Sequence, residues 1–298
     1  MELGVCLAGG GVKGAAHIGA LKALKEKNIQ IDCISGTSSG SIVATLYALG
    51  YSCEEILDIF KRYSKKIKYI DLKNIYNIIK NFIFKHKLII EGFNTGEIIE
   101  KTIDKLCNNK NVYNISDVKK RLLITSVSLN NGKIYFFENL NNRNTYSDEI
   151  ISVNNINIGK AVRASCSFPG FFCPVKYNED LLIDGGVREN IPWKEVKKRG
   201  IDKVFCISFE EEIKNKKNKN IIDSIYGAIN LMGRELSNYE LSGADYVLKI
   251  KTKEISLLDF KEIEYLYNLG YNKTKEYLEK YLLNNIKINK AINKIKTN

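Results

Sequence analysis

The pentapeptide Gly36-Thr37-Ser38-Ser39-Gly40 constrains this chain more than any other stretch. An apolar run with β character, residues 29–34, precedes it, and a run rich in alanine and leucine, residues 41–49, follows with helical character. In a strand–turn–helix setting, Gly-x-Ser-x-Gly forms a nucleophile elbow, in which two glycines permit a turn tight enough to hold the serine on a strained corner. The helix N-terminus then stabilises negative charge that develops nearby. The pattern predicts a nucleophile at Ser38.

A second glycine-rich stretch, Gly9-Gly10-Gly11-Val12-Lys13-Gly14, follows an expected buried strand over residues 3–7 and precedes a helix expected over residues 15–27. It matches the dinucleotide-binding pattern Gly-x-Gly-x-x-Gly, and Asp32 lies near the distance expected of a ribose-binding acid. However, the second strand runs directly into the serine elbow, and no Lys-Ser or Lys-Thr pair follows to make a phosphate loop. The favoured interpretation is that this loop presents backbone N–H groups as an oxyanion hole beside Ser38.

A candidate acid lies much later in the chain, in Leu181-Leu182-Ile183-Asp184-Gly185-Gly186. Here a short apolar strand ends in Asp184, and two glycines free the backbone behind it. An Asp-Gly pair alone is typical of a turn. The surrounding region nevertheless holds all three prolines of the chain, Pro169, Pro174 and Pro192, which concentrates rigid turns around this acid.

A serine nucleophile needs a base, usually a histidine within hydrogen-bond reach. The chain has two histidines. His17 lies on an apolar helical face, which predicts a packed, hydrogen-bonded core residue, and His86 lies between two lysines in an expected exposed turn. Because no histidine follows Asp184, the order Ser…Asp…His of α/β-hydrolases is impossible here. Either the serine is not catalytic, or a carboxylate acts on it directly.

The charge of the chain indicates which kinds of partner it could bind. The 298 residues carry a net charge of +12, which attracts a chain to nucleic acid or anionic lipid but is also found in a lysine-rich solvated surface. Seven cysteines form an odd number without a Cys-x-x-Cys pair, so we expect reduced, mostly buried thiols and neither disulfides nor zinc. The start shows no signal peptide, and no apolar run is long enough for a membrane span. We therefore expect a soluble protein made in the cytoplasm.

The segment 75–93 is unusually apolar and aromatic but is interrupted by lysines. It is typical of helices that cover a core, and the alternative is a cap that contacts lipid.

An Asn-Asn-Gly turn at residues 130–132 predicts a hairpin. Further strands are expected over residues 122–129, 133–138, 204–209 and 246–250. Helices are expected over residues 54–66, 95–107, 154–164 and 260–282. Residues 164–174 are expected to form an apolar loop, residues 211–220 a disordered connection and residues 284–298 a basic tail.

The three glycine-bearing motifs, in this order and spacing, resemble the patatin-like phospholipase family. Residues 15–21 and 164–172 are also similar to that family, and the resemblance extends over residues 1 to about 250. Gly186 stands where many members have alanine. The resemblance implies a three-layer α/β/α sandwich with a mainly parallel central sheet. It also implies one acyl hydrolase domain over residues 1–298, with the motifs within about 3–210 and a cap or insert at about 60–120.

The resemblance further implies a Ser–Asp dyad. Ser38 would attack an ester carbonyl, Asp184 would accept the hydroxyl proton, and the N–H groups of Gly10, Gly11 and Val12 would hold the oxyanion. No metal or other cofactor is implied. The expected substrate is a phospholipid, lysophospholipid or other acyl lipid, with peripheral contact to an anionic membrane surface and no nucleic-acid partner. Two alternatives stay open: a soluble esterase or thioesterase with the same dyad, and a non-catalytic lipid-binding module. Head group, acyl position and oligomeric state are undetermined by these residues.

Overall fold

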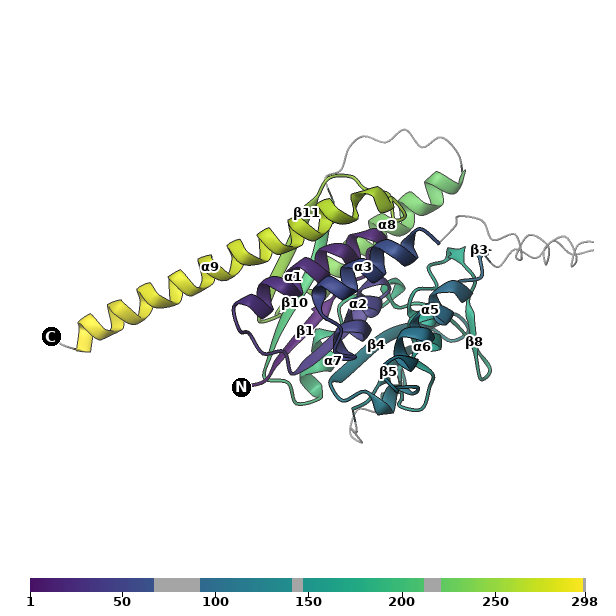
Figure 1. Ribbon diagram of the computed structural model, residues 1–298, viewed down its shortest axis with the longest axis horizontal. Coiled ribbons are helices and arrows are strands. Elements are labelled where there is room, and N and C mark those ends of the chain that lie inside the picture. Colours follow the sequence, from purple (N-terminus) through teal and green to yellow (C-terminus); the bar gives the residue numbers. More distant parts are fainter. Residues whose placement is uncertain (67–91, 141–146, 212–220, 297–298) are drawn as a thin grey trace, which may run out of the picture.

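A mostly parallel sheet forms the centre of the computed structural model, which describes residues 1–66, 92–140, 147–211 and 221–296 (Figure 1). Adjacent strands from β11 to β4 run parallel, β4 and β5 form the expected antiparallel hairpin, and β6 runs parallel to β5. The strand order is β11 (Tyr246–Thr252), β10 (Lys203–Glu211), β1 (Leu3–Leu7), β2 (Cys33–Thr37), β4 (Arg121–Ser128), β5 (Ile134–Glu138) and β6 (Ile150–Val153).

Four further strands are found in the described residues. The hairpin of β8 (Val175–Tyr177) and β9 (Asp180–Asp184) joins the main sheet because β9 pairs antiparallel with the end of β4. A separate small parallel pair consists of β3 (Gly92–Asn94) and β7 (Gly170–Phe172). Short 3₁₀ turns follow β1 at Gly11–Lys13 and β9 at Gly185–Val187. Two more lie at Ile115–Asp117 and Phe260–Glu262.

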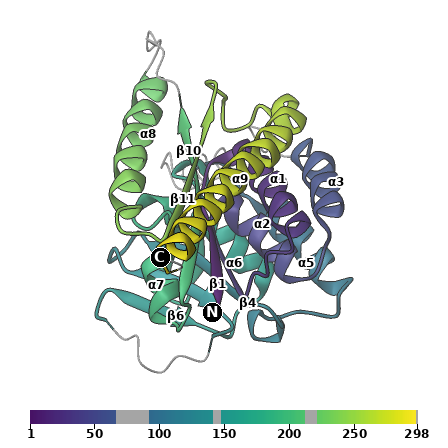
Figure 2. The same ribbon diagram turned by 90° about the vertical axis from the view of Figure 1, so that its left-hand side faces the viewer.

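Helices cover both faces of the sheet, as Figure 2 shows. Successive residues of β1 and Ala8, which follows it, point to opposite faces: Val5 and Leu7 belong to the larger apolar cluster, and Cys6 and Ala8 to the smaller one. The larger cluster lies under α1 (Gly14–Glu26), α2 (Ser39–Ala48), α3 (Cys53–Ser64), α5 (Glu97–Asn108), α6 (Ile158–Ser165) and α9 (Ile263–Lys296). On the other face lie α7 (Trp193–Lys198) and α8 (Ile221–Glu240). The expected three-layer α/β/α fold is confirmed.

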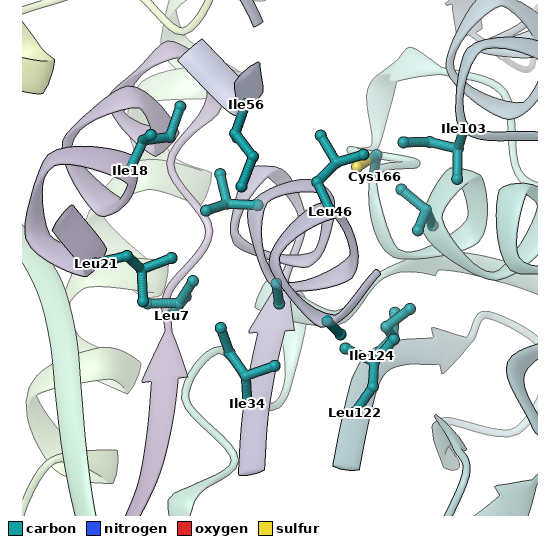
Figure 3. Packing of buried hydrophobic residues seen from close by; sticks show 14 of the residues in the cluster. Leu7, Ile18, Leu21, Ile34, Leu46, Ile56, Ile103, Leu122, Ile124 and Cys166 are labelled. Atoms are coloured by element: carbon teal, nitrogen blue, oxygen red, sulfur yellow. The ribbon is translucent and has the colours of Figure 1, made fainter. Parts of the chain in front are cut away.

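Branched aliphatic side chains fill the larger cluster (Figure 3). Ile18 of α1 and Leu46 of α2 lie on the helical side of Leu7 and Ile34 of β1 and β2, whereas Ile103 of α5 lies beyond Leu46, beside Cys166. Each of these isoleucine and leucine side chains is at most 2% exposed. Burial of this kind is worth about 1.5–3 kcal/mol per large apolar side chain. The cluster therefore holds the carboxyl ends of β1 and β2 rigidly beside each other, and both glycine motifs begin there.

Several sequence-based expectations need correction. The second strand spans Cys33–Thr37, not residues 29–34, because β2 pairs in register with β1 from Gly4↔Cys33 to Leu7↔Gly36. The expected loop at 164–174 contains β7, which pairs with β3. The helix expected over residues 154–164 is α6, which begins only at Ile158, because the Asn157 side chain accepts the N–H of Lys160 and caps the helix there.

Other expectations agree with the structure or fall outside it. The helix expected over 260–282 is α9, whose backbone continues through most of the basic tail to Lys296. Helix α8 was not predicted, although apolar residues recur three or four positions apart in residues 221–240, at Ile222, Ile225, Ile229, Met232 and Leu236. The segment 75–93, expected to be a core-covering helix or a lipid-contacting cap, lies outside the described residues up to 91, and residues 92 and 93 belong to β3. The connection expected over 211–220 also lies outside them, except for residue 211, which ends β10. All seven cysteines are buried, and no disulfide joins any two of them. No helix in the described ranges has the length and apolar character needed to cross a membrane.

Candidate active site

Ser38 occupies a sharp turn between β2 and α2, in the strand–turn–helix setting that its motif predicts. Its backbone lies at φ 53° and ψ −128°, a conformation that residues other than glycine rarely adopt. A methyl group on Gly36 would lie 2.3 Å from the carbonyl oxygen of Gly40, and one on Gly40 would lie 2.4 Å from that of Leu7. The two glycines therefore let the start of α2 cross closely over β1 and β2, which forces Ser38 onto the corner.

Hydrogen bonds on both sides of the turn hold it in place. The N–H of Ser38 donates to Oγ of Ser165, at the end of α6, over 2.9 Å. The carbonyl oxygen of Ser38 accepts the N–H of Ser41 at 2.8 Å and the Ser41 hydroxyl at 2.6 Å. These contacts offset the cost of the strained backbone, which is about 1–3 kcal/mol for such a residue.

Strand β4 brings Asp184 beside Ser38. Thr37, the last residue of β2, pairs with Thr125, and Asp184, the last residue of β9, pairs with the next residue of β4, Ser126. At these residues β5 pairs with the other edge of β4, so β2 and β9 pair with the same edge of β4. Because β2 runs parallel to β4 and β9 antiparallel to it, the carboxyl ends of β2 and β9 approach each other end to end. The residue that follows Thr37 therefore meets Asp184, although the two are far apart in sequence.

The Asp184 carboxyl is buried at the base of this site, with the residue only 2% exposed. Its Oδ1 accepts the N–H of Gly186 at 2.8 Å. Within the described part of the chain, Oδ2 meets no hydrogen-bond partner in good geometry, although the Ser38 hydroxyl is close enough to act on the carboxyl. Burial raises the pKa of Asp184 to about 6, and the Ser38 hydroxyl and the Gly186 N–H oppose that rise. The group is therefore a stronger base than an ordinary aspartate.

The glycine-rich loop after β1 lies on the other side of Ser38. The N–H of Gly9 donates to Oδ1 of Asn190 at 2.8 Å, and the N–H of Lys13 donates to the Gly10 carbonyl at 3.2 Å. The N–H of Gly14 is bonded within the same turn. Among the residues that the structure describes, Gly10 and Gly11 are the two members of this loop whose N–H groups meet no acceptor.

The expectation of a third oxyanion donor at Val12 does not hold. The Val12 N–H donates to the carbonyl oxygen of Leu257 at 2.8 Å and so anchors the loop to the segment before α9. The position of Asp32 also excludes the dinucleotide-binding alternative. Asp32 accepts the N–H of Leu3 at 2.8 Å, at the opposite end of β1 from the glycine loop, where it could not reach a ribose bound there.

A cavity of about 1760 Å³ opens onto Ser38, Asp184 and the glycine loop. Apolar side chains dominate its walls, including Phe60, Ile99, Phe171 and Phe172. The cationic side chains of Lys13 and Arg234 line it as well, and Lys13 is only 8% exposed. A largely apolar pocket with a few convergent polar groups is the usual form of a small-molecule site.

His17 is fully buried, as its apolar helical face predicts. Its Nε2 lies 2.8 Å from the carbonyl oxygen of Ala8, and its ring packs 4.7 Å from that of Phe209. Burial lowers its pKa to about 4. The imidazole is therefore a neutral core group. His86 lies outside the described residues.

Sequence reasoning assigned no role to two site residues, Ser165, which lies in the stretch 164–172 that resembles the family, and Asn190. Both act through side-chain hydrogen bonds to backbone N–H groups of distant segments. The one signal near Asn190 was Pro192, which marked a rigid turn after Asp184 without indicating what the turn contacts.

Comparison with known proteins gives the family. The model of the patatin-like phospholipase family matches residues 5–197. The uncharacterized protein R571 of Acanthamoeba polyphaga mimivirus is 30% identical over 93% of this chain and 94% of its own length. Lysophospholipase NTE1 of Candida glabrata is 29% identical over 69% of this chain, which spans only 10% of that larger protein. The crystal structure of VipD from Legionella pneumophila shares the fold, with a TM-score of 0.54 at 16% identity, covering 94% of this chain and 67% of VipD. The chain belongs to the patatin-like phospholipase family.

Proposed function

We propose that this protein hydrolyses carboxylic esters of phospholipids or lysophospholipids through a Ser38–Asp184 dyad. The observation that carries the proposal is the pairing of Thr37 and Asp184 with consecutive residues of β4, which sets the strained serine against a buried carboxyl. Two unpaired backbone N–H groups, those of Gly10 and Gly11, lie in the loop on the far side of Ser38. These are the parts that acyl transfer through a serine requires.

In the first step, Ser38 Oγ attacks the ester carbonyl carbon while the Asp184 carboxylate accepts the hydroxyl proton. The carbonyl oxygen becomes an anion that accepts hydrogen bonds from Gly10 and Gly11. Loss of one such donor typically costs about 2.7–4 kcal/mol of transition-state stabilisation. The bond to the leaving alcohol then breaks, and Asp184 gives its proton to that alcohol.

In the second step, water attacks the acyl-Ser38 ester while Asp184 accepts the water proton. The same oxyanion donors serve again, and Ser38 recovers its proton as the fatty acid leaves. The raised pKa of Asp184, about 6, suits a group that must both accept and return a proton near neutral pH.

The cavity supports a lipid substrate. Its apolar walls fit an acyl chain, and Lys13 and Arg234 would attract a phosphate head group. Large apolar side chains that are 37–72% exposed also line it: Phe93, Leu129, Val187, Leu231 and Met232. We define these five as the apolar rim. Exposed apolar side chains around the opening to an apolar pocket suit contact with a bilayer surface, and the net charge of +12 would favour anionic lipid.

The test is fatty-acid release from phosphatidylcholine and lysophosphatidylcholine vesicles by the wild type, Ser38→Ala and Asp184→Asn. Both variants are expected to lose activity by at least about 10³-fold, on the scale of losses that removal of a dyad member causes. Ser116→Ala and Asp58→Asn, at exposed positions away from the cavity, are the matched controls.

Full activity in either dyad variant would contradict the mechanism. Turnover of a short p-nitrophenyl ester without any release from vesicles would favour the soluble esterase. Vesicle binding without hydrolysis of any ester would favour the lipid-binding module.

A further inference from the structure

Asn190 lies where three parts of the molecule meet. It follows the Asp184-Gly185-Gly186 turn, precedes α7 and lines the cavity. Its Oδ1 accepts the N–H of Gly9 at 2.8 Å, and its Nδ2 donates to Oγ of Ser237, on α8, at 2.9 Å. One carboxamide therefore links the glycine loop to α8.

The partners fix the orientation of this carboxamide. The Gly9 N–H can only donate, so it requires the oxygen. The Ser237 hydroxyl donates to the carbonyl oxygen of Gly233 at 2.8 Å, so it accepts from the nitrogen. An alkyl side chain at position 190 would lose both contacts. A carboxylate would still accept the Gly9 N–H, but it could keep the contact with Ser237 only if that hydroxyl gave up its bond to Gly233.

The backbone around Asn190 is held as firmly as its side chain. The two carboxylate oxygens of Glu240, at the end of α8, accept the N–H groups of Asn190 at 2.9 Å and Ile191 at 3.0 Å. Indole Nε1 of Trp193 donates to the Glu240 carbonyl oxygen at 2.5 Å. Glu240 is only 7% exposed. These bonds fix the backbone of Asn190, so its side chain can hold Gly9 in one place.

We propose that Asn190 is a positioning residue for the oxyanion hole. Gly9 directly precedes Gly10 and Gly11, the two residues whose N–H groups remain unpaired, and a run of glycines has little rigidity of its own. The bond from Gly9 to Asn190 restricts that run on one side, as the bond from Val12 to Leu257 restricts it on the other. The inference rests on the proposed function, since it assigns Gly10 and Gly11 as donors to the developing oxyanion.

The test measures kcat and KM of the wild type, Asn190→Ala and Asn190→Asp on a soluble p-nitrophenyl ester and on its thionoester, in which sulfur replaces the carbonyl oxygen. We expect Asn190→Ala to lower kcat on the oxygen ester by about 100-fold with little change in KM, as a misplacement of about 1 Å does. Asn190→Asp keeps an acceptor for the Gly9 N–H but loses the N–H donor to Ser237, so its kcat should lie between those of Asn190→Ala and the wild type.

Comparison of the oxygen ester with the thionoester separates a misplaced oxyanion hole from a loss of folded protein. Sulfur is a weak acceptor of N–H hydrogen bonds, so an intact oxyanion hole favours the oxygen ester. The ratio of the two kcat values should fall by about tenfold in Asn190→Ala, because the lost catalysis belongs to that hole. A simple loss of folded protein would lower both rates equally and leave the ratio unchanged.

Asn238→Ala is the matched control, since Asn238 lies on α8 next to Ser237, is exposed and does not line the cavity. Wild-type kcat in a folded Asn190→Ala, or an unchanged oxygen-to-sulfur ratio in that variant, would overturn the inference. A wild-type protein that cleaves no ester would instead overturn the proposed function, so the two failures are distinguishable.

Discussion

The backbone N–H of Ser38 donates to the side-chain oxygen of Ser165 at 2.9 Å, across 127 positions of sequence. This bond ties the turn after β2 to the last residue of α6. The serine that carries the strained backbone, at φ 53°, is therefore held from outside its own segment. Strain that a surrounding structure maintains in this way is typical of functional sites.

Replacement of Ser38 by glycine should abolish ester hydrolysis and raise stability. Glycine adopts a positive φ without a steric cost, so the free energy of unfolding should increase by about 1 kcal/mol. Thermal melting followed by circular dichroism measures the change, and Ser38→Ala, which keeps a Cβ, should be inactive without that gain. A lower melting temperature in Ser38→Gly would contradict the assignment of strain to this residue.

The activity should depend on the protonation of Asp184. The base must be ionised, and burial raises its pKa to about 6. Below that pH, kcat/KM for a soluble ester should fall about tenfold per pH unit, and above it the rate should level off. An ordinary aspartate would place this limb near pH 4. A pH–rate profile with a limb at that lower value would show that Asp184 is not the base or is not buried in solution.

Membrane contact through the apolar rim should depend on α8. Burial of a methionine side chain contributes about 1.5–3 kcal/mol, and a charge in its place opposes burial. Met232→Asp should therefore weaken binding to anionic vesicles by at least about tenfold, measured by vesicle sedimentation. Tyr239→Ser, on the same helix but away from the cavity, is the control. Equal binding of Met232→Asp and wild type would exclude this part of the rim from the contact.

The crossing of α1 and α9 should tolerate no added methyl group. A Cβ on Gly270 of α9 would lie 1.9 Å from the carbonyl oxygen of Ala16 on α1. Gly270→Ala should lower the free energy of unfolding by about 2 kcal/mol or more, because the two helices must separate. The control is Gly227→Ala in α8, where a Cβ meets nothing within 4 Å and the substitution should stabilise the helix by about 0.5–1 kcal/mol. Denaturant unfolding measures both, and an unperturbed Gly270→Ala would mean that the helices do not cross so closely.

The local features of the site could be predicted from the sequence. The elbow around Ser38, the apolar strand that ends at Asp184 and the unsuitability of either histidine all follow from residue types within short segments. These motifs together indicated the family and its α/β fold. The start of β2 was placed four residues too early, because the apolar run was taken as the strand when pairing with β1 decides its register.

What the sequence by itself determined is which residues could perform the chemistry. Only the tertiary structure decided how they meet. The pairing of Thr37 and Asp184 with consecutive residues of β4 depends on three strands from distant parts of the chain. The same holds for the loop, where Val12 is engaged by Leu257 and Gly9 by Asn190, which leaves Gly10 and Gly11 unpaired. The physical reason is that motif patterns reflect backbone preferences within a few residues. Register and side-chain hydrogen bonds arise only when segments that are distant in the sequence pack against one another.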